Sequence, residues 1–226
     1  MKKYITIAAL LAAGTTFANA ETLVLGTTTY TATDVSFELI GSSAGNYGTD
    51  WLKNGRAAIN MEKDLTENWL VSFTVTADAG EQTIFSTSTK NATTEGEYGG
   101  YNIRYKDGYL ALRDASSSVV GTASTSVGSP AECYLWYYGD VLSLGYKSTD
   151  GSIVTVASAE NVTDLSLTKS SSATAASVAK FWTAGGKNTF EGIKVQTLVA
   201  VPEPSAFGML AGLGALALVA ARRRRK

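Results

Sequence analysis

Short runs of alternating apolar and polar residues, separated by Gly, Asp, Asn and Ser, fill the chain between residues 21 and 201. A period of two is typical of strands that bury one face, and its regular repetition predicts an all-β sandwich or barrel. No stretch of this segment shows a sustained helical period, with residues 173–180 as the weak exception. The pattern predicts strands at residues 22–30, 35–40, 56–61, 69–77, 82–88, 98–106, 109–114, 133–138, 141–147, 152–157 and 192–198.

Two turns between these strands are specified by their residue types. Asp107-Gly108 joins two runs, and an Asp-Gly pair readily adopts the positive φ angles of a type I′ hairpin. Gly139-Asp140 predicts a type II′ turn, and Ser148-Thr149-Asp150-Gly151 predicts a longer turn. Residues 133–157 are therefore expected to form a three-stranded antiparallel meander.

The first 20 residues have the three parts of a secretory signal peptide. Met1-Lys2-Lys3 supplies positive charge, residues 5–13 are apolar, and the small residues Ala18 and Ala20 flank Asn19 at a cleavage site. Cleavage after Ala20 would make Glu21 the new N-terminus. A membrane-spanning helix is the alternative, but the apolar run is too short to cross a bilayer.

The last residues predict a second targeting segment. Val201-Pro202-Glu203-Pro204 precedes an apolar stretch at residues 205–221, which as a helix would be about 25 Å long and barely spans a bilayer. We expect this hydrophobic helix to anchor the precursor in the inner membrane, with a basic end retained on the cytoplasmic side. That membrane stop consists of Arg222, Arg223, Arg224, Arg225 and Lys226.

This order of motif, apolar span and basic tail resembles the PEP-CTERM sorting signal of Gram-negative bacteria, a segment also known as the "ice-binding protein C-terminal" motif. The resemblance implies that an exosortase recognises residues 201–204 and removes the tail, and that the protein reaches the cell surface or the extracellular matrix. A membrane-anchored protein without this processing is the alternative. The expected division is a signal peptide at residues 1–20, a folded domain at 21–198 and a sorting signal at 199–226.

Composition excludes several functions. The chain has no histidine, which rules out Ser-His-Asp catalysis and His-ligated metals, and its single cysteine, Cys133, cannot form an intrachain disulfide. Twelve of the 19 basic residues and 19 of the 20 acidic residues lie between residues 21 and 201, so this segment has a formal charge near −7. An acidic domain without a basic run is a poor nucleic-acid binder.

The strand order of the domain resembles the LamG-like, concanavalin A-like jelly roll, an antiparallel two-sheet sandwich. The segments that carry the resemblance are 69–73, 82–86, 101–112, 142–146 and 190–195. Members of this group bind carbohydrate or protein, some bind calcium, and related jelly rolls include glycoside hydrolases. The resemblance therefore implies a carbohydrate- or matrix-binding domain. The aspartates Asp107, Asp140 and Asp150 could supply calcium ligands, but all three are explained as turn residues, and we expect no cofactor.

The spacing E-x-D-x-x-E at Glu62, Asp64 and Glu67 resembles the active-site strand of laminarinase-type retaining glycosidases. In that interpretation Glu62 is the nucleophile and Glu67 the acid/base, because retention needs two carboxyl groups about 5–5.5 Å apart. The resemblance has apolar residues between the acids, whereas Lys63 and Thr66 are polar, which indicates a solvated turn. We expect a non-catalytic protein, with a laminarinase-like hydrolase and a purely structural biofilm matrix protein as alternatives.

Aromatic residues are the candidate ligand contacts. A period of two places Tyr134, Trp136 and Tyr138 on one face of their strand, with Cys133, Leu135 and Tyr137 on the other. Flat aromatic rows stack on sugar rings, but rings also commonly fill the space between two sheets, and the latter use is favoured.

A loop residue and one further strand have the same two alternatives, exposure or burial. Trp51 lies in a polar loop at residues 46–51, where it is either exposed for a ligand or plugs the end of the sandwich. In the run before the Asp107-Gly108 turn, Tyr101, Ile103 and Tyr105 are expected to face inward, and Asn102, Arg104 and Lys106 outward.

Overall fold

The computed structural model describes residues 20–41, 47–53, 55–77, 80, 82–88, 100–163, 165–169, 179–182 and 188–202. The signal peptide up to Asn19, and the residues from Glu203 to Lys226 with their expected hydrophobic helix, lie outside these ranges. No helix within the described ranges combines the length and the apolar character that crossing a membrane requires.

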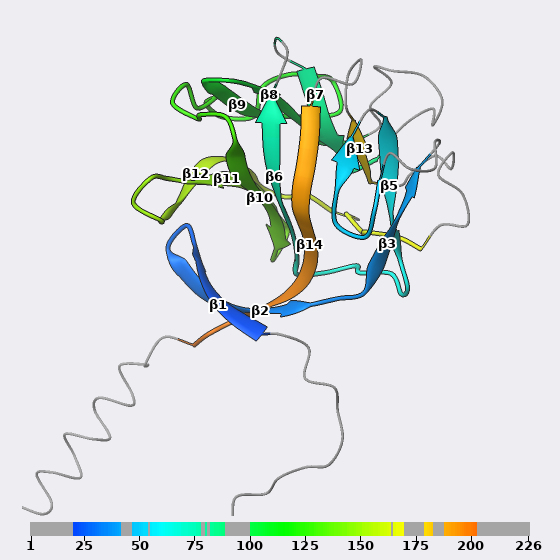
Figure 1. The fold of residues 1–226 in the computed structure, drawn as a ribbon. Coiled ribbons are helices and arrows are strands. Elements are labelled where there is room, and N and C mark those ends of the chain that lie inside the picture. The colour runs from blue at the N-terminus through cyan, green and yellow to red at the C-terminus, as the bar shows by residue number, and fades with distance from the viewer. Residues whose placement is uncertain are drawn as a thin grey trace, which may run out of the picture.

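The described chain is built of strands, as the alternating pattern predicts (Figure 1). The strands are β1 (Ala20–Leu25), β2 (Thr28–Asp34), β3 (Phe37–Gly41), β4 (Leu52–Lys53), β5 (Arg56–Met61), β6 (Trp69–Ala77), β7 (Gln82–Ser86), β8 (Asn102–Lys106), β9 (Tyr109–Arg113), β10 (Ala131–Tyr138), β11 (Val141–Lys147), β12 (Ile153–Ala159), β13 (Lys180–Trp182) and β14 (Asn188–Ala200).

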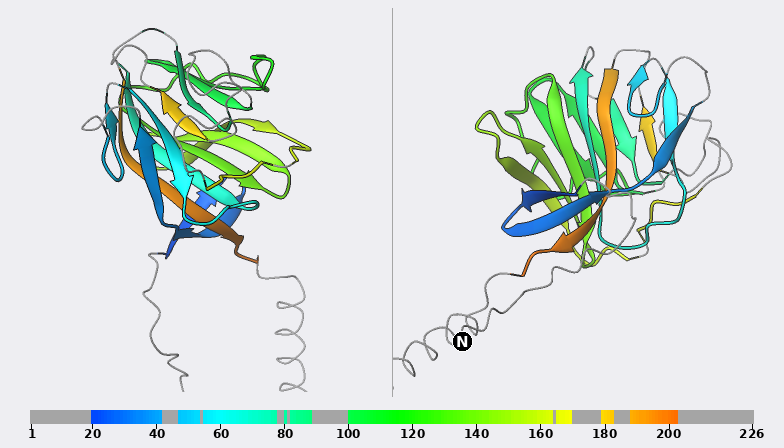
Figure 2. Two further views of the ribbon diagram at one scale, coloured as in Figure 1. Left: turned by 90° about the vertical axis from the view of Figure 1, so that its right-hand side faces the viewer. Right: turned by 60° about the horizontal axis from the view of Figure 1, so that its bottom comes forward.

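Two antiparallel sheets pack face to face as a jelly-roll sandwich (Figure 2). In the described residues, one sheet has eight strands in the order β1-β2-β14-β6-β10-β11-β12, with β4 added to β14. The other has six strands in the order β3-β5-β13-β7-β8-β9. The chain crosses from the eight-stranded to the six-stranded sheet between β2 and β3, which places residues 35 and 36 at an edge of the sandwich.

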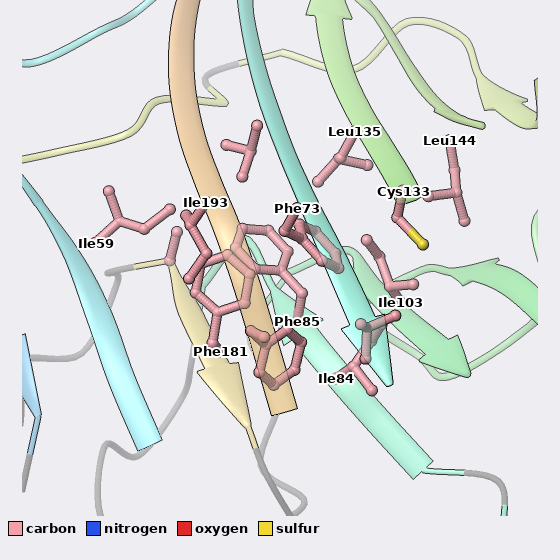
Figure 3. Packing of buried hydrophobic residues seen from close by; sticks show 14 of the residues in the cluster. Ile59, Phe73, Ile84, Phe85, Ile103, Cys133, Leu135, Leu144, Phe181 and Ile193 are labelled. Atoms are coloured by element: carbon pink, nitrogen blue, oxygen red, sulfur yellow. The ribbon is translucent and has the colours of Figure 1, made fainter. Parts of the chain in front are cut away.

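Phenylalanines from both sheets form the centre of the main core (Figure 3). Phe181 of β13 packs 5.1 Å from Phe73, 4.9 Å from Phe85 and 5.1 Å from Phe190, measured between ring centroids. These side chains come from four strands, and edge-to-face contacts of this kind add about 0.5–1.5 kcal/mol each beyond area burial. The short strand β13 is therefore held to both sheets by one buried ring.

A second core lies on the other face of the eight-stranded sheet. It contains Leu25, Tyr30, Ala32, Leu70, Tyr134, Trp136 and Leu198, all from that sheet alone. The sheet curls until its edge strands β1 and β12 contact each other, and the hairpin β1–β2 covers the aromatic residues of β10. Curling thus gives a single sheet enough enclosed apolar surface to form a core of its own.

Some expected strands differ from the observed ones. The expected strand at 22–30 is two strands, because Gly26 adopts a φ of +63° and turns the chain back into a hairpin. The strands β4 and β13 were not predicted, since two or three residues cannot display a period. The weak helical segment at 173–180 ends in β13, and residues 173–178 lie outside the described ranges.

Candidate functional site

The predicted aromatic row divides between faces as expected but serves as core. Cys133, Leu135 and Tyr137 point into the space between the sheets, and Tyr134 and Trp136 point into the second core with 6% and 5% of their surface exposed. The rings of Tyr134 and Trp136, predicted as a possible ligand surface, are therefore almost inaccessible. Tyr138 is half-buried, with its ring centroid 4.9 Å from that of Tyr30.

Polar contacts also hold Tyr134 in place. Its hydroxyl donates a hydrogen bond to Glu132, whose other oxygen lies 3.0 Å from Lys147 Nζ. Burial alone would raise the pKa of Glu132, but the hydrogen bond from Tyr134 and the nearby Lys147 outweigh it and lower the pKa. Burial, together with the hydrogen bond to Glu132, raises the pKa of Tyr134. Burial likewise raises the pKa of the Cys133 thiol, so Cys133 packs as a small apolar residue.

The loop that carries Trp51 is closed by its own backbone. Gly48 N–H donates a hydrogen bond to the Trp51 carbonyl over 3.0 Å, and Tyr47 and Leu52 form an isolated antiparallel β-bridge. The half-buried indole lies so close to Gly48 that a Cβ atom there would overlap it. Trp51 thus folds back onto its own loop, and the same turn brings Thr49 and Asp50 to the edge of the sandwich.

Two adjoining depressions mark that edge, and together we call them the edge groove. They share Ser36 and Phe37 at the crossover between β2 and β3. The first, of about 360 Å³, is lined by Asp34, Val35, Ser36, Phe37, Thr49, Asp50, Ile193, Lys194 and Val195. The second, of about 310 Å³, is lined by Ser36, Phe37, Glu38, Asn60, Met61, Glu62 and Lys169. Each falls at the lower end of the roughly 300–1,000 Å³ range of small-molecule sites.

Backbone hydrogen bonds position the first depression. Val35 N–H donates to the Val195 carbonyl over 2.9 Å, and Ile193 N–H donates to the Asp50 carbonyl over 2.9 Å. The register of β14 against β6 shifts between Glu191 and Lys194, where Gly192 has a φ of +61°. This bulge re-aims the side chains that follow it, so the half-exposed Lys194 reaches the groove and lies 3.6 Å from Glu21.

The second depression holds one of the predicted glycosidase carboxylates but not its partner. Residues 62–68 connect β5 to β6, so the three acids do not share a strand. Asp64 accepts a hydrogen bond from Lys169 N–H over 2.6 Å, and Glu67 is exposed outside the groove lining. The carboxylate that lines the depression with Glu62 is Glu38, which accepts a hydrogen bond from Asn60 Nδ2 over 2.6 Å.

The aspartates weighed as calcium ligands lie in separate turns. Asp140 has a φ of +63° and accepts a hydrogen bond from Tyr137, whereas Asp150 accepts from the Ser152 hydroxyl and backbone N–H. Those hydrogen bonds from Ser152 lower the pKa of Asp150. Asp107 begins the turn to Gly108, and no group of three or more Asp, Glu or Cys residues in the described ranges could hold a metal ion.

The edge groove was not predicted from the sequence. Its residues come from segments near positions 34–38, 49–50, 60–62, 169 and 193–195, which only the folded chain brings together. Two weak signals existed: Asp50 belongs to the polar loop in which Trp51 was singled out, and Glu62 belongs to the acidic motif. Phe37 gave no signal, because it looks like any strand residue.

Comparison with known proteins identifies the C-terminal segment first. Residues 200–225 match the family model of the PEP-CTERM protein-sorting motif. The chain is thus an exported, two-sheet β-sandwich protein that carries an exosortase sorting signal. Of the motif residues, Val201 and Pro202 are described and exposed, and Glu203 and Pro204 lie outside the described ranges. No curated protein sequence matches the chain.

Several solved structures are similar to the chain at low identity. The VIP36 exoplasmic/lumenal domain, in a form bound to Ca²⁺ and Man3GlcNAc, is 9% identical, with 75% of this chain and 88% of that chain covered and a TM-score of 0.46. The carbohydrate-binding module CBM66 from Bacillus subtilis is 12% identical, with 74% and 95% covered and a TM-score of 0.40. The family 7 alginate lyase A1-II' is 10% identical, with 84% and 86% covered and a TM-score of 0.33. The ligands and activities named here belong to the solved structures.

Proposed function

We propose that this chain is a cell-surface or extracellular-matrix protein that binds carbohydrate in the edge groove without cleaving it. The observation that carries the proposal is the position of Phe37, whose half-buried ring packs against the main core and borders both polar depressions. A sugar ring can stack on an aromatic face while carboxylates, amides and ammonium groups bind its hydroxyls. Asp34, Asp50, Asn60 and Lys194 supply such groups around Phe37.

The sorting signal supports this location and partner set. The signal peptide would take the precursor across the inner membrane, where an exosortase would recognise the PEP-CTERM motif. After removal of both ends, the protein would be released to the cell surface or the matrix, where we propose that it binds polysaccharide. We infer that the inner membrane is a transient partner, reached through residues 205–221, and that the mature protein has no membrane anchor.

A glycan array probed with the detergent-purified full-length protein tests the binding. Phe37→Ala and Asp50→Asn are expected to lower the apparent affinity for the bound glycan about tenfold each, which corresponds to about 1.4 kcal/mol. Tyr109→Ala and Asp150→Asn are matched controls, because they remove a half-buried aromatic residue and a turn aspartate away from the groove. A well-folded protein that binds no glycan, or equal losses in the controls, would overturn the proposal. Repeating the array with EDTA tests the calcium alternative.

Glu38 and Glu62 favour a second candidate, a glycoside hydrolase, because both line the same depression. Both are exposed, whereas acid/base catalysis of glycoside cleavage depends on one carboxyl group being held in a different environment from the other. Release of reducing sugar from a bound glycan, abolished by Glu62→Gln and by Glu38→Gln, would establish the hydrolase. Binding without release supports the non-catalytic function.

A further inference from the structure

Three of the exposed valines lie together at one end of the eight-stranded sheet. In the described residues the exposed large apolar side chains are Val24, Val119, Val154, Val199 and Val201. Val24 belongs to β1, Val199 to β14, and Val201 directly follows β14. Val199 is the most exposed of them, at 63%. Singly exposed apolar residues are ordinary, but a cluster of them marks a contact surface.

The strand register shows that these valines share one face. Thr22 pairs with Thr31, which pairs with Val199, and Val24 pairs with Thr29. Val201 continues the ladder, because its N–H donates to the Thr29 carbonyl over 2.8 Å. The residues between them, Leu23, Tyr30 and Leu198, point into the second core instead. Val24, Val199 and Val201 therefore share one outward face, on which Thr29 and Thr31 of β2 lie between Val24 and the other two, and we call it the valine face.

The valine face is continuous with the sorting signal. The PEP-CTERM match begins at residue 200, so Val201 belongs both to the folded ladder and to the motif. The apolar span expected at residue 205 starts four residues beyond Val201, a reach of at most about 14 Å even when extended. An enzyme that cleaves the motif beside the membrane must therefore approach the valine face closely.

The backbone at the same place leaves room for a partner. The strand β6 pairs with β14 only as far as Thr197, and the backbone carbonyl of Asn68 accepts a hydrogen bond from Leu198 N–H. Beyond that point, the edge of β14 that faces away from β2 pairs with no strand among the described residues. We call this stretch the Ala200 edge. Pro202, two residues further along the same edge, has no N–H to offer an added strand, so backbone pairing with a partner is limited to Ala200. This short open edge directly beside the motif leaves room for a partner to approach the backbone.

We propose that exosortase docks on the valine face and the Ala200 edge, so that it recognises the folded end of the sandwich as well as the linear motif. The termini fit this arrangement, because β1 and the last residues of β14 lie at the same end of the molecule (Figures 1 and 2). The membrane-facing end of the precursor is thus the end that carries the valine face. This inference rests on the sorting motif and is independent of carbohydrate binding.

Site-specific photocrosslinking in Gram-negative cells tests the contact directly. The full-length precursor carries a benzoylphenylalanine at position 199 or, as a control, at position 119, where another exposed valine forms a bridge with Arg113 of β9 in the six-stranded sheet. The cells also produce an epitope-tagged, catalytically inactive exosortase, so that the complex persists. A crosslinked product containing the tag at position 199 and not at 119 supports the proposal. Crosslinks only to lipid, or none above the control, overturn it.

The rate of tail removal gives a second readout with active exosortase. In a pulse-chase experiment, the double variant Val24→Lys, Val199→Lys is expected to be processed at least about fivefold more slowly, as a loss of about 1 kcal/mol of docking energy implies. Val119→Lys, beside β9 of the six-stranded sheet, is the matched control expected to be processed at the wild-type rate. Protease resistance of each variant confirms folding. A folded double variant that is processed at the wild-type rate contradicts the proposal.

Discussion

Lys180 is a residue whose buried position lowers the stability of the fold. It lies in β13, paired with Ala58 of β5 and Ser86 of β7, and only 1% of its surface is exposed. Its Nζ has no hydrogen-bond partner in the described structure. Burial, and secondarily the charge of Arg56, lower the pKa of Lys180 from its ordinary value of 10.5. A buried donor without a partner is unfavourable by about 1–3 kcal/mol.

Lys180→Met is therefore expected to raise the free energy of unfolding at pH 7 by about 1 kcal/mol, because it keeps the buried methylene chain and removes the ammonium group. The folded-state pKa lies below the unfolded one, so the unfolded chain binds more protons between them. Wild-type stability should thus rise as the pH increases through that window, up to 10.5, and the variant should lack this rise.

Urea unfolding at several pH values measures both effects. Lys106→Met is the matched control, because Lys106 is exposed on β8 of the same sheet, two strands from β13, and its variant should keep the wild-type pH dependence. A Lys180→Met protein that is less stable than wild type at pH 7 would show that the ammonium group has a favourable partner.

At the scale of strands, the second core explains why the hairpin β1–β2 stays on the sheet. Trp136 is 5% exposed and lies among Leu25, Tyr30 and Leu198. Trp136→Ala is expected to lower the free energy of unfolding by about 3–5 kcal/mol, the usual range for removing a buried aromatic residue. Trp51→Ala, on a half-buried ring outside this core, should cost less than about 2 kcal/mol.

Chemical denaturation followed by tryptophan fluorescence compares the two variants. Limited proteolysis adds a local readout, since loosening of the second core should expose β1 and β2 before the rest of the sheet. Equal destabilisation by the two substitutions would mean that the second core contributes no more than a surface loop does.

The features of the fold that could be predicted are those that depend on residues close together in the sequence. The meander at residues 133–157, the hairpin at Asp107-Gly108 and the inward positions of Ile103 and Tyr105 depend on near neighbours, and the structure confirms them. The predicted turn types were wrong: Gly108 but not Asp107 has a positive φ, so that turn is not type I′, whereas Gly139 and Asp140 both have a positive φ, as in type I′ and not II′. Asn102, expected to face outward, is 1% exposed, so lying outside the main core did not make it accessible. The period of two assigns a face but not what covers that face, which is why the aromatic row of β10 was correctly divided yet belongs to an unforeseen core.

The edge groove could not be predicted, because its residues lie far apart in the sequence. Asp50 and Ile193 are joined by a backbone hydrogen bond across 143 positions, and the bulge at Gly192 decides where Lys194 points. Neither fact has a local signature in the sequence. Sites assembled from crossovers and bulges depend on the completed topology, and a sorting motif, which is read as a linear segment, does not.

At the scale of the molecule, the last strand of the described residues is a central one. The strand β14 lies between β2 and β6, pairs with both, and contributes Phe190, Ile193 and Val195 to the main core. The eight-stranded sheet therefore cannot close until residue 200 has crossed the membrane. Because the sorting signal begins at that residue, the folded domain and an accessible motif should appear at nearly the same moment of export.

Truncation tests this dependence. A chain that stops after Pro202 keeps all of β14 and its hydrogen bond from Val201 to Thr29, so it should resist protease as the full-length protein does. A chain that stops after Glu191 loses the segment that pairs with β2 and the core residues Ile193, Val195 and Leu198. Without them the two halves of the eight-stranded sheet are separated, and the exported chain should be degraded within minutes of addition of protease. If the shorter chain resisted protease as well as the longer one, the sandwich would be closed by its other strands, and folding would precede the arrival of the sorting signal.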